Sequence, residues 1–258
     1  MTTLVPKPQT TEIFYPSSDG EPLAESYVHL YAILVTLEVL KQYLQGIQAT
    51  VLADQYLYYS QGFPRLRVAP DVMVIFNVAP GGRDNYKIWE EGEVPSVIFE
   101  MTSPGTKNQD TGNKKTLYEQ IGVQEYWLFD PKGEWIEEKL RGYRLDGEKY
   151  KLITDSCSEP LQLRLQVEGQ LISFYQVDTG EKLLIPQELK EALQQERIAR
   201  RQETEALRQE RIARQQETEA LRQERIARQQ AEQEARIANL QVEKLKQKLK
   251  ELDIDLDE

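Results

Sequence analysis

The sequence predicts a mixed α/β domain followed by one long C-terminal helix. Continuous apolar runs at residues 72–76 and 97–99 are rich in branched side chains, which is typical of central strands covered on both faces of a sheet. A helical stretch separates the second run from another apolar run at residues 125–130, and this strand, helix, strand order implies a crossover connection. After residue 180 the composition changes, and neither Gly nor Pro follows Pro186. This last observation predicts an uninterrupted helix.

The elements expected before the first core strand are an arm, a helix and a strand. Residues 1–22 are rich in Pro, Thr and Ser, which predicts a loose N-terminal arm. Apolar residues recur at helical spacing over residues 24–45, and Gly46 is placed to end that helix. Residues 50–59 are apolar and aromatic and predict a strand.

The elements expected after the first core strand are a loop, a helix, a further strand and hairpins. Residues 77–94 are polar and have no clean period, so they predict a loop with a short turn of helix. The second helix is expected from about Asn108 to Gly122, before the strand at residues 125–130. Turn signals at Asp146-Gly147 and Glu168-Gly169 predict hairpins that extend or flank the sheet.

Length and composition limit the classes of protein to consider. The 258 residues, 40% of them hydrophobic, allow one ordinary domain with an appendage. No apolar stretch is long enough to span a membrane and the N-terminus has no export signal, so a soluble cytoplasmic protein is expected. The single Cys157 excludes an internal disulfide, and with only one histidine a Cys/His zinc site is also excluded. Any metal must therefore be bound by oxygen.

The charge balance argues against tight non-specific binding to nucleic acid. Residues 1–192 carry 18 basic and 28 acidic side chains, whereas residues 193–258 carry 14 and 15. The acid excess thus lies on the globular part, although affinity for nucleic acid normally depends on Lys and Arg. A small cleft can still be locally basic. The residues expected to border it are Arg65, Arg67, Lys107, Lys114 and Lys115.

Two acids at the ends of apolar runs and a nearby lysine carry the chemical prediction. Asp71 opens one run, Glu100 ends another, and Lys114 opens the second helix. Two carboxylates hold a hard cation through oxygen, and the cation activates water and stabilises the charge that develops at phosphorus. Asp71 alone would more often cap a turn, but a buried Glu100 needs a cation or a strong donor. Together the three residues predict a metal-dependent phosphodiesterase.

These residues lie in phrases that resemble the PD-(D/E)xK nuclease superfamily and, more closely, the bacterial Uma-type restriction endonucleases. The phrases run from about Leu23 to about Tyr150 and are LAESYVH, VAPDVMVIF, VPSVIFEMTSPGTKNQD, KKTLYEQIGVQEYWLFDP and LRGYRLDGEKY. The resemblance implies a restriction-endonuclease-like mixed sheet flanked by helices in residues 23–180. It also implies hydrolysis of DNA phosphodiester bonds with Mg2+ or Mn2+.

The resemblance also suggests roles for individual residues. The parent pattern has a lysine two residues after the second acid, where this chain has Thr102; in the Uma-type family the lysine has moved to the following helix, at the position of Lys114. Lys115 is the alternative. An acid at the position of Glu25 often completes the metal shell in this family, so the expected metal ligands are Asp71, Glu100 and Glu25.

Two polar residues near these positions have more than one interpretation. His29 lies one helical turn after Glu25, so it is either a proton shuttle or a residue at the boundary of the core. Asp110 precedes the second helix, where capping is the expected role.

Residues 181–258 form the predicted helical extension. Tandem repeats cover residues 193–206, 207–220 and 221–235, with one apolar cluster per heptad. Pairs spaced i,i+4 should support this part of the helix, and they are Glu196 with Arg200, Glu210 with Arg214 and Glu224 with Arg228. Residues 231–256 have a stronger heptad seam, which predicts a partner helix and, most simply, a homodimer.

Alternatives from other functional classes remain at this point. The domain could be a nuclease fold that has lost activity and binds nucleic acid, or an assembly protein whose function lies in the helical tail. The acid pair and lysine favour the enzyme, whereas the acidic balance and long tail favour the alternatives. The sequence leaves open the target sequence and the choice between DNA and RNA, since it contains no known base-reading motif.

Overall fold

The computed structural model describes residues 13–18, 26–102, 105–106 and 108–251. It confirms the mixed α/β class with a long C-terminal helix, and contacts divide the chain into two compact units, Met1–Lys190 and Glu191–Glu258. Within the described residues, no helix is both long enough and apolar enough to cross a membrane.

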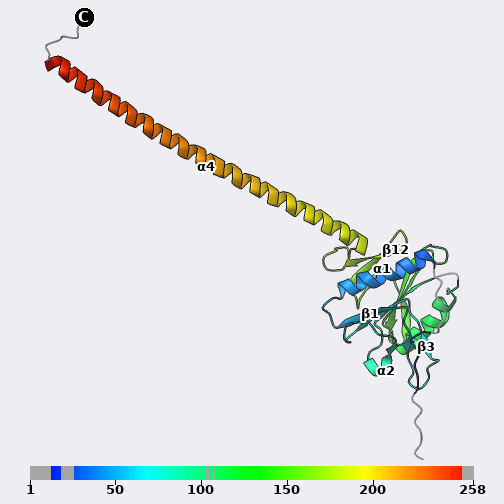
Figure 1. The fold of residues 1–258 in the computed structure, drawn as a ribbon. Coiled ribbons are helices and arrows are strands. Elements are labelled where there is room, and N and C mark those ends of the chain that lie inside the picture. The colour runs from blue at the N-terminus through cyan, green and yellow to red at the C-terminus, as the bar shows by residue number, and fades with distance from the viewer. Residues whose placement is uncertain (1–12, 19–25, 103–104, 107, 252–258) are drawn as a thin grey trace, which may run out of the picture. The chain divides into compact units, whose positions relative to one another are not determined.

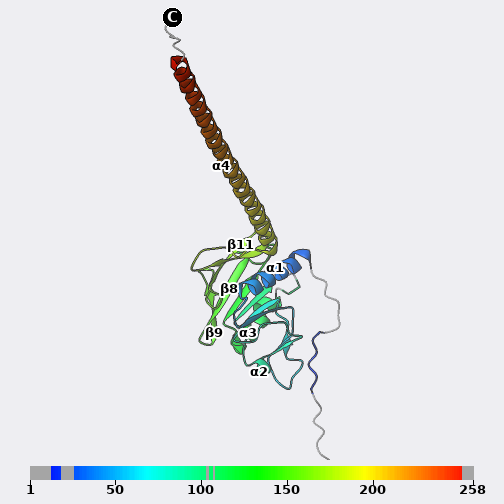
Figure 2. The ribbon, with the colours of Figure 1, turned by 60° about the vertical axis from the view of Figure 1, so that its left-hand side comes forward.

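A mixed sheet forms the centre of the first unit (Figures 1 and 2). In the described residues its strands are, in spatial order, β1 (Ala49–Ala53), β4 (Val72–Phe76), β6 (Val97–Met101), β7 (Glu125–Phe129), β8 (Leu140–Asp146) and β9 (Lys149–Ile153). Strands β6 and β7 are parallel and are joined through helix α3 (Lys115–Ile121), as the predicted crossover requires. The neighbouring strand pairs are antiparallel.

Different elements cover the two faces of this sheet. On one face, helix α1 (Tyr27–Tyr43) packs with strands β11 (Leu163–Glu168) and β12 (Leu171–Gln176) over a core that includes Phe99 and Trp127. The views in Figures 1 and 2 show α1 beside these strands. On the other face, α3 contributes Tyr118 to a second core that includes Ile98 and Tyr126. Both faces of β4, β6 and β7 are therefore buried, which explains their continuous apolar sequences.

Smaller sheets flank the central one. Strand β10 (Cys157–Ser158) joins β11 and β12, so the second predicted hairpin flanks the main sheet, whereas the first, β8 with β9, extends it. Strands β3 (Arg67–Val68), β2 (Leu57–Tyr58) and β5 (Tyr86–Lys87) form another small sheet, in that order.

The prediction of a single strand at residues 50–59 is wrong. It divides into β1 and β2, which belong to different sheets. The break occurs at Asp54, whose φ of 51° lies in the left-handed region and cannot continue a strand. The Asp54 amide donates instead to the carbonyl oxygens of Pro70 and Asp71, at 3.1 and 3.3 Å. This bond ties the break to the start of β4.

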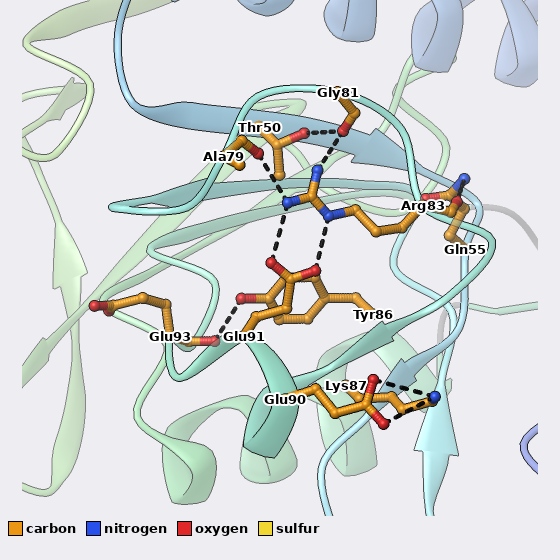
Figure 3. A network of polar contacts seen from close by, with 10 residues as sticks. All are labelled: Thr50, Gln55, Ala79, Gly81, Arg83, Tyr86, Lys87, Glu90, Glu91 and Glu93. Atoms are coloured by element: carbon orange, nitrogen blue, oxygen red, sulfur yellow. Dashed lines mark hydrogen bonds and ion pairs between the residues drawn. The ribbon is translucent and has the colours of Figure 1, made fainter.

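The segment predicted as a loop at residues 77–94 has a fixed path around Arg83 (Figure 3). It contains β5 and the short helix α2 (Ile88–Glu91). The Arg83 guanidinium donates to both carboxylate oxygens of Glu91, at 2.8 and 3.0 Å, and to the carbonyl oxygens of Gly81 and Ala79. Thr50 Oγ1 on β1 donates to the same Gly81 oxygen at 2.7 Å. These bonds hold β5, and through it the small sheet, against the central sheet.

The described part of the predicted arm packs on the small sheet. The Tyr15 ring lies against Tyr58 and Trp89, with centroid distances of 5.1 and 5.3 Å. Its hydroxyl accepts a hydrogen bond from the Gly62 amide at 2.7 Å, and Tyr58 donates to the carbonyl of Pro16. Contacts of Tyr15 and Pro16 thus anchor residues 13–18.

The C-terminal helix α4 extends from Pro186 to Glu251. Its start is a capping arrangement, because the Glu188 carboxylate accepts from the Ile185 amide at 3.1 Å. The predicted pairs Glu196–Arg200 and Glu210–Arg214 form, at 2.9 and 2.7 Å. The third predicted pair is wrong, since Arg228 contacts Glu232, at 3.2 Å, in place of Glu224. On an exposed helix face both carboxylates lie one turn from the arginine, so the sequence does not decide between them.

Candidate active site

Asp71 and Glu100 lie opposite each other on neighbouring antiparallel strands. Val72 of β4 pairs with Phe99 of β6, so the preceding residue Asp71 falls opposite the following residue Glu100. Residues opposite each other on one sheet face have Cβ atoms about 4.5–5.5 Å apart. The Met101 amide donates to Asp71 Oδ2 at 2.6 Å and thereby fixes the Asp71 carboxylate at this end of β6.

Glu100 is buried against α3. Its exposed fraction is 1%, and side chains alternate along β6, so Phe99 and Met101 enter the core under α1 while Glu100 points to the α3 face. Lys114 Nζ donates to Glu100 Oε2 at 2.8 Å, and Tyr118 Oη donates to Oε1 at 2.7 Å. The carboxylate is therefore held at both oxygens.

The two neighbouring lysines have different environments. Lys114 contacts Glu100, whereas Lys115 Nζ lies 3.9 Å from the centre of the Tyr143 ring. Consecutive residues of a helix point about 100° apart, so only one of the pair can face the acids. The structure brings Asp71, Glu100 and Lys114 together and leaves Lys115 outside.

Asp110 is a member of the cluster that the sequence interpretation did not include. It is 1% exposed, and its Oδ1 lies 3.2 Å from Lys114 Nζ. The predicted capping role is wrong, because the segment Gln109–Lys114 is a turn of π-helix whose N-cap is Asn108, and Asp110 lies inside it. Apart from the ion pair of Oδ1 with Lys114, neither carboxylate oxygen of Asp110 has a hydrogen-bond partner in the part of the chain that the structure describes. Single π-helical turns are frequent at functional sites.

The π-helical turn is held in place from below by the sheet. Tyr126 on β7 donates to the backbone carbonyl of Asp110 at 2.9 Å, and this contact is buried. The spacing of four residues between Asp110 and Lys114 is common on regular α-helices, so it does not predict a π-helical turn. The nearest available signal was Gly112 and Asn113 within the predicted helix, since both residues weaken a regular α-helix.

Burial governs the ionisation of this cluster. Burial raises the pKa of Glu100 to about 7, against the opposing effect of Lys114. Burial, followed by the charge of Glu100, raises the pKa of Asp71 well above its ordinary value. Burial by itself would lower the pKa of Lys114, but Glu100 and Asp110 outweigh it and raise that pKa. Lys114 is therefore a fixed cation beside Glu100 and Asp71, two acids that bind protons more readily than usual.

The remaining residues suggested by the sequence lie on or before α1. His29 is 5% exposed, and its Nε2 lies 3.7 Å from Asp71 Oδ2, beyond direct hydrogen-bond distance. The position places His29 at the edge of the acid cluster. Glu25 lies outside the described residues.

Comparisons with known proteins give one family match. The family model described as "Putative restriction endonuclease" (Uma2) matches residues 9–174. The chain belongs to the Uma2 family. The match contains every residue of the cluster, from His29 to Tyr118, and ends before α4.

Other comparisons add little about this Uma2 protein. A crystal structure described as "a putative nuclease belonging to DUF820" from Anabaena variabilis has 14% sequence identity and a TM-score of 0.40. The similarity covers 65% of the present chain and 86% of that chain. No curated protein matches the sequence.

The donor atoms of the Uma2 site suit a hard divalent cation. Asp71 and Glu100 offer carboxylate oxygens from opposite strands, and Asp110 adds buried oxygens that lack hydrogen-bond partners within the described residues. Mg2+ commonly uses one or two carboxylates and keeps several waters, so a complete protein cage is not required. In the described ranges no three Asp, Glu, His or Cys side chains are grouped so as to hold a metal together. What the described residues offer is carboxylate oxygen, the donor type that Mg2+ takes.

A basic hollow opens beside the acids of the Uma2 site. It has a volume of about 490 Å3, and Lys114 and Gln109 border it on one side. Arg65, Arg67 and Tyr56 border it on another. The sequence predicted that Arg65, Arg67 and Lys114 share a cleft, and the structure places them in one. Lys115 lies apart over Tyr143, and Lys107 is outside the described residues.

Proposed function

We propose that this Uma2 protein is an endonuclease that hydrolyses DNA phosphodiester bonds with Mg2+ or Mn2+. The observation that supports it best is the position of Glu100, a buried carboxylate opposite Asp71 and in contact with Lys114. Burying a carboxylate is unfavourable unless it is paired, and this one is paired with a lysine that also borders an open hollow. A buried titratable residue that is paired with a charged partner beside a cleft is typical of catalytic sites.

Each residue of the cluster has a role in this proposal. Asp71 and Glu100 would hold the cation, and Glu25 is proposed as a further ligand from the family resemblance alone. When bound, the cation supplies an activated water and stabilises negative charge on the phosphoryl oxygens. Lys114 stabilises charge on the phosphate through its fixed ammonium group. Tyr118 keeps the Glu100 carboxylate oriented by its hydrogen bond to Oε1.

Metal binding and cleavage can be tested on the same variants. Mn2+ or Mg2+ should raise the thermal unfolding temperature of the full chain, because cation binding relieves the repulsion between Asp71 and Glu100. At a metal concentration about 100 times the dissociation constant the gain is about 2.7 kcal/mol. Glu100→Gln should abolish both this rise and the cleavage of DNA, assayed on single-stranded and on plasmid DNA. Glu148→Gln, on an exposed turn, is the control and should preserve both.

The opposite results would contradict the proposal. A metal-induced rise that survives in both Asp71→Asn and Glu100→Gln would place the ion elsewhere in the protein. A wild-type chain that binds DNA but never cleaves it, with Mg2+ or with Mn2+, would favour a nuclease-fold binding module.

We also propose that residues 231–256 mediate a homodimer. The described apolar side chains of the seam in this segment include two that are largely exposed in the single chain, with fractions of 49% for Val242 and 60% for Leu245. A heptad seam of this kind is stabilised by a partner helix. A dimer would bring two nuclease domains to one DNA molecule.

A further inference from the structure

The basic hollow is distinct from the rest of the protein surface in its charge. The chain has a formal net charge of -11, yet the described residues that line the hollow include Arg65, Arg67 and Lys114 and no carboxylate. Lys114 links the hollow to the acid cluster, because it lines the hollow and also contacts Glu100. An anion that enters the hollow would therefore meet mainly cationic side chains, although acidic residues outnumber basic ones over the whole chain.

Contacts within the protein hold the Arg67 side chain in position. Its guanidinium lies 4.1 Å from the centre of the Tyr56 ring, a cation–π distance. Its Nη1 donates to the carbonyl of Pro64 at 3.3 Å and to Tyr58 Oη at 3.5 Å. A guanidinium held in this way loses little conformational freedom when it binds a phosphate.

The loop before Arg67 carries exposed apolar side chains beside the cations. Phe63 is 60% exposed and Leu66 is 41% exposed, and Arg65 lies between them in sequence. The loop has a defined shape, because the Leu66 amide donates to the Phe63 carbonyl at 2.9 Å and Gly62 is bonded to Tyr15. Proteins that bind single-stranded nucleic acids combine exposed aromatic rings, on which bases stack, with basic side chains along the backbone.

The size of the hollow limits what can enter it. Its volume of about 490 Å3 lies in the range of sites for small molecules, about 300–1,000 Å3, which is too small for a double helix. A base can stack on an exposed aromatic ring only when that face of the base is free. Base-paired DNA inside a duplex offers no such face.

We infer that the hollow and the 62–67 loop hold an unpaired nucleotide next to the scissile phosphate, with Arg65 and Arg67 on its phosphates and Phe63 on its base. This inference rests on the proposed nuclease function and narrows it. Single strands and unpaired ends are the expected substrates, and intact duplex is bound weakly.

Binding to labelled DNA tests this without any metal. The full chain in EDTA is titrated against a short single strand and against a blunt duplex of the same sequence, with fluorescence anisotropy as the readout. Stacking of one base corresponds to about tenfold in affinity, so the single strand should bind at least about tenfold more tightly. Phe63→Ala should remove most of that difference and leave the salt dependence of binding unchanged.

The arginines should show a different signature. Arg65→Ala removes one phosphate contact, so the slope of log affinity against log salt should become shallower by about 0.7 for the single strand. The matched controls are Leu152→Ala, an exposed apolar side chain on β9 with an exposed fraction of 57%, and Lys151→Ala, an exposed lysine on the same strand. Both controls should bind as the wild type does.

Certain outcomes would overturn the inference. These are equal affinity for duplex and single strand, no binding of the single strand, or a Phe63→Ala variant that behaves like Leu152→Ala. Because Phe63 and Arg65 are exposed, loss of folding is not the expected effect of either change. Retained preference for single strands without any cleavage would contradict the nuclease proposal alone. Duplex cleavage that Phe63→Ala does not alter would contradict this inference alone.

Discussion

The buried acid cluster and helix α4 both contain acid–base pairs spaced i,i+4, but the pairs differ in their exposure to water. Lys114 and Asp110 are four residues apart, as are Glu210 and Arg214, and both pairs are in contact. The Asp110 side chain is 1% exposed and that of Lys114 17%, whereas those of Glu210 and Arg214 are 55% and 77% exposed. Exposed pairs contribute about 0.2–0.5 kcal/mol and leave their members in water.

The difference teaches that burial, more than pairing, gives a charged residue unusual chemistry. In the cluster, burial raises the pKa of Glu100 to about 7, so this carboxyl group can gain or lose a proton near neutral pH. Along α4, water screens the charges, and the pairs serve only to support the helix. The following predictions test this contrast, from the largest expected effect to the smallest.

Replacing the buried lysine should have the largest effect. Lys114→Ala should lower the rate of DNA cleavage by about 10²–10³, because a preoriented charge at the phosphate is lost. The metal-induced rise in unfolding temperature should survive, since Lys114 is not a ligand. Lys115→Ala is the matched control and should cost little, because Lys115 lies over Tyr143. Equal losses from both variants would contradict the assignment of Lys114.

The stability of the metal-free protein should fall as the pH rises through about 7. The pKa of Glu100 is higher in the folded chain than its ordinary value of 4.5, so folding takes up a proton between these two values. The resulting penalty is absent below pH ~4.5 and fully present above pH ~7, where it amounts to roughly 3 kcal/mol. Asp71 has the same direction of shift.

Denaturant unfolding in EDTA at about pH 5 and about pH 8 measures this effect. Glu100→Gln should reduce the difference between the two pH values, whereas Glu148→Gln should not change it. Asp110→Asn should shift the transition to lower pH, because the charge of Asp110 raises the pKa of Glu100. A wild-type protein that becomes more stable across this range would show that other groups dominate its pH dependence.

Changes to the apolar seam of α4 should alter assembly and leave the globular unit intact. Val242→Asp with Leu245→Asp places charges on exposed apolar positions, with exposed fractions of 49% and 60%, that a partner helix would cover. The full chain should sediment as a dimer, and both this variant and a chain ending at Gln230 should sediment largely as monomers. A monomeric wild type, or a truncated chain that remains dimeric, would leave the tail as a spacer or as a surface for another protein.

Breaking one exposed pair on α4 should have the smallest effect. Glu210→Gln should lower helix stability by about 0.2–0.5 kcal/mol at low salt, and by less at high salt because the charges are screened. Circular dichroism of the full chain during heating measures it. A loss as large as that expected for a buried pair would mean that α4 is covered by a partner along its repeats.

The apolar pattern predicted much of the fold, and local departures from regular structure account for the rest. Strands β4 and β6 lie where the branched runs occur and β7 lies at the apolar run at residues 125–130, since burial on both faces leaves a continuous signal. The break at Asp54 and the docking of Tyr15 were missed, because each depends on partners distant in sequence. Propensity does not report such contacts.

The candidate site shows the same division. Asp71, Glu100 and Lys114 were suggested by acids at strand ends and a lysine at a helix start, and the structure brings them together. Asp110 was interpreted as a cap, because an acid before a helix usually is one and a π-helical turn has no recognised sequence pattern. Arg67 was named for its charge alone, and its fixed position over Tyr56 required the structure.

The opposition of Asp71 and Glu100 depends on the register of the apolar core strands. Glu100 points to the α3 face because the residues of β6 alternate between two cores, with Phe99 and Met101 in the core under α1 and Ile98 in the other. Inserting one residue within residues 97–99 would shift this alternation and turn Glu100 toward the core under α1. An insertion or deletion that a surface loop tolerates would here displace the side chains of the site. Selection on packing and selection on catalysis would then act on the same few strand residues.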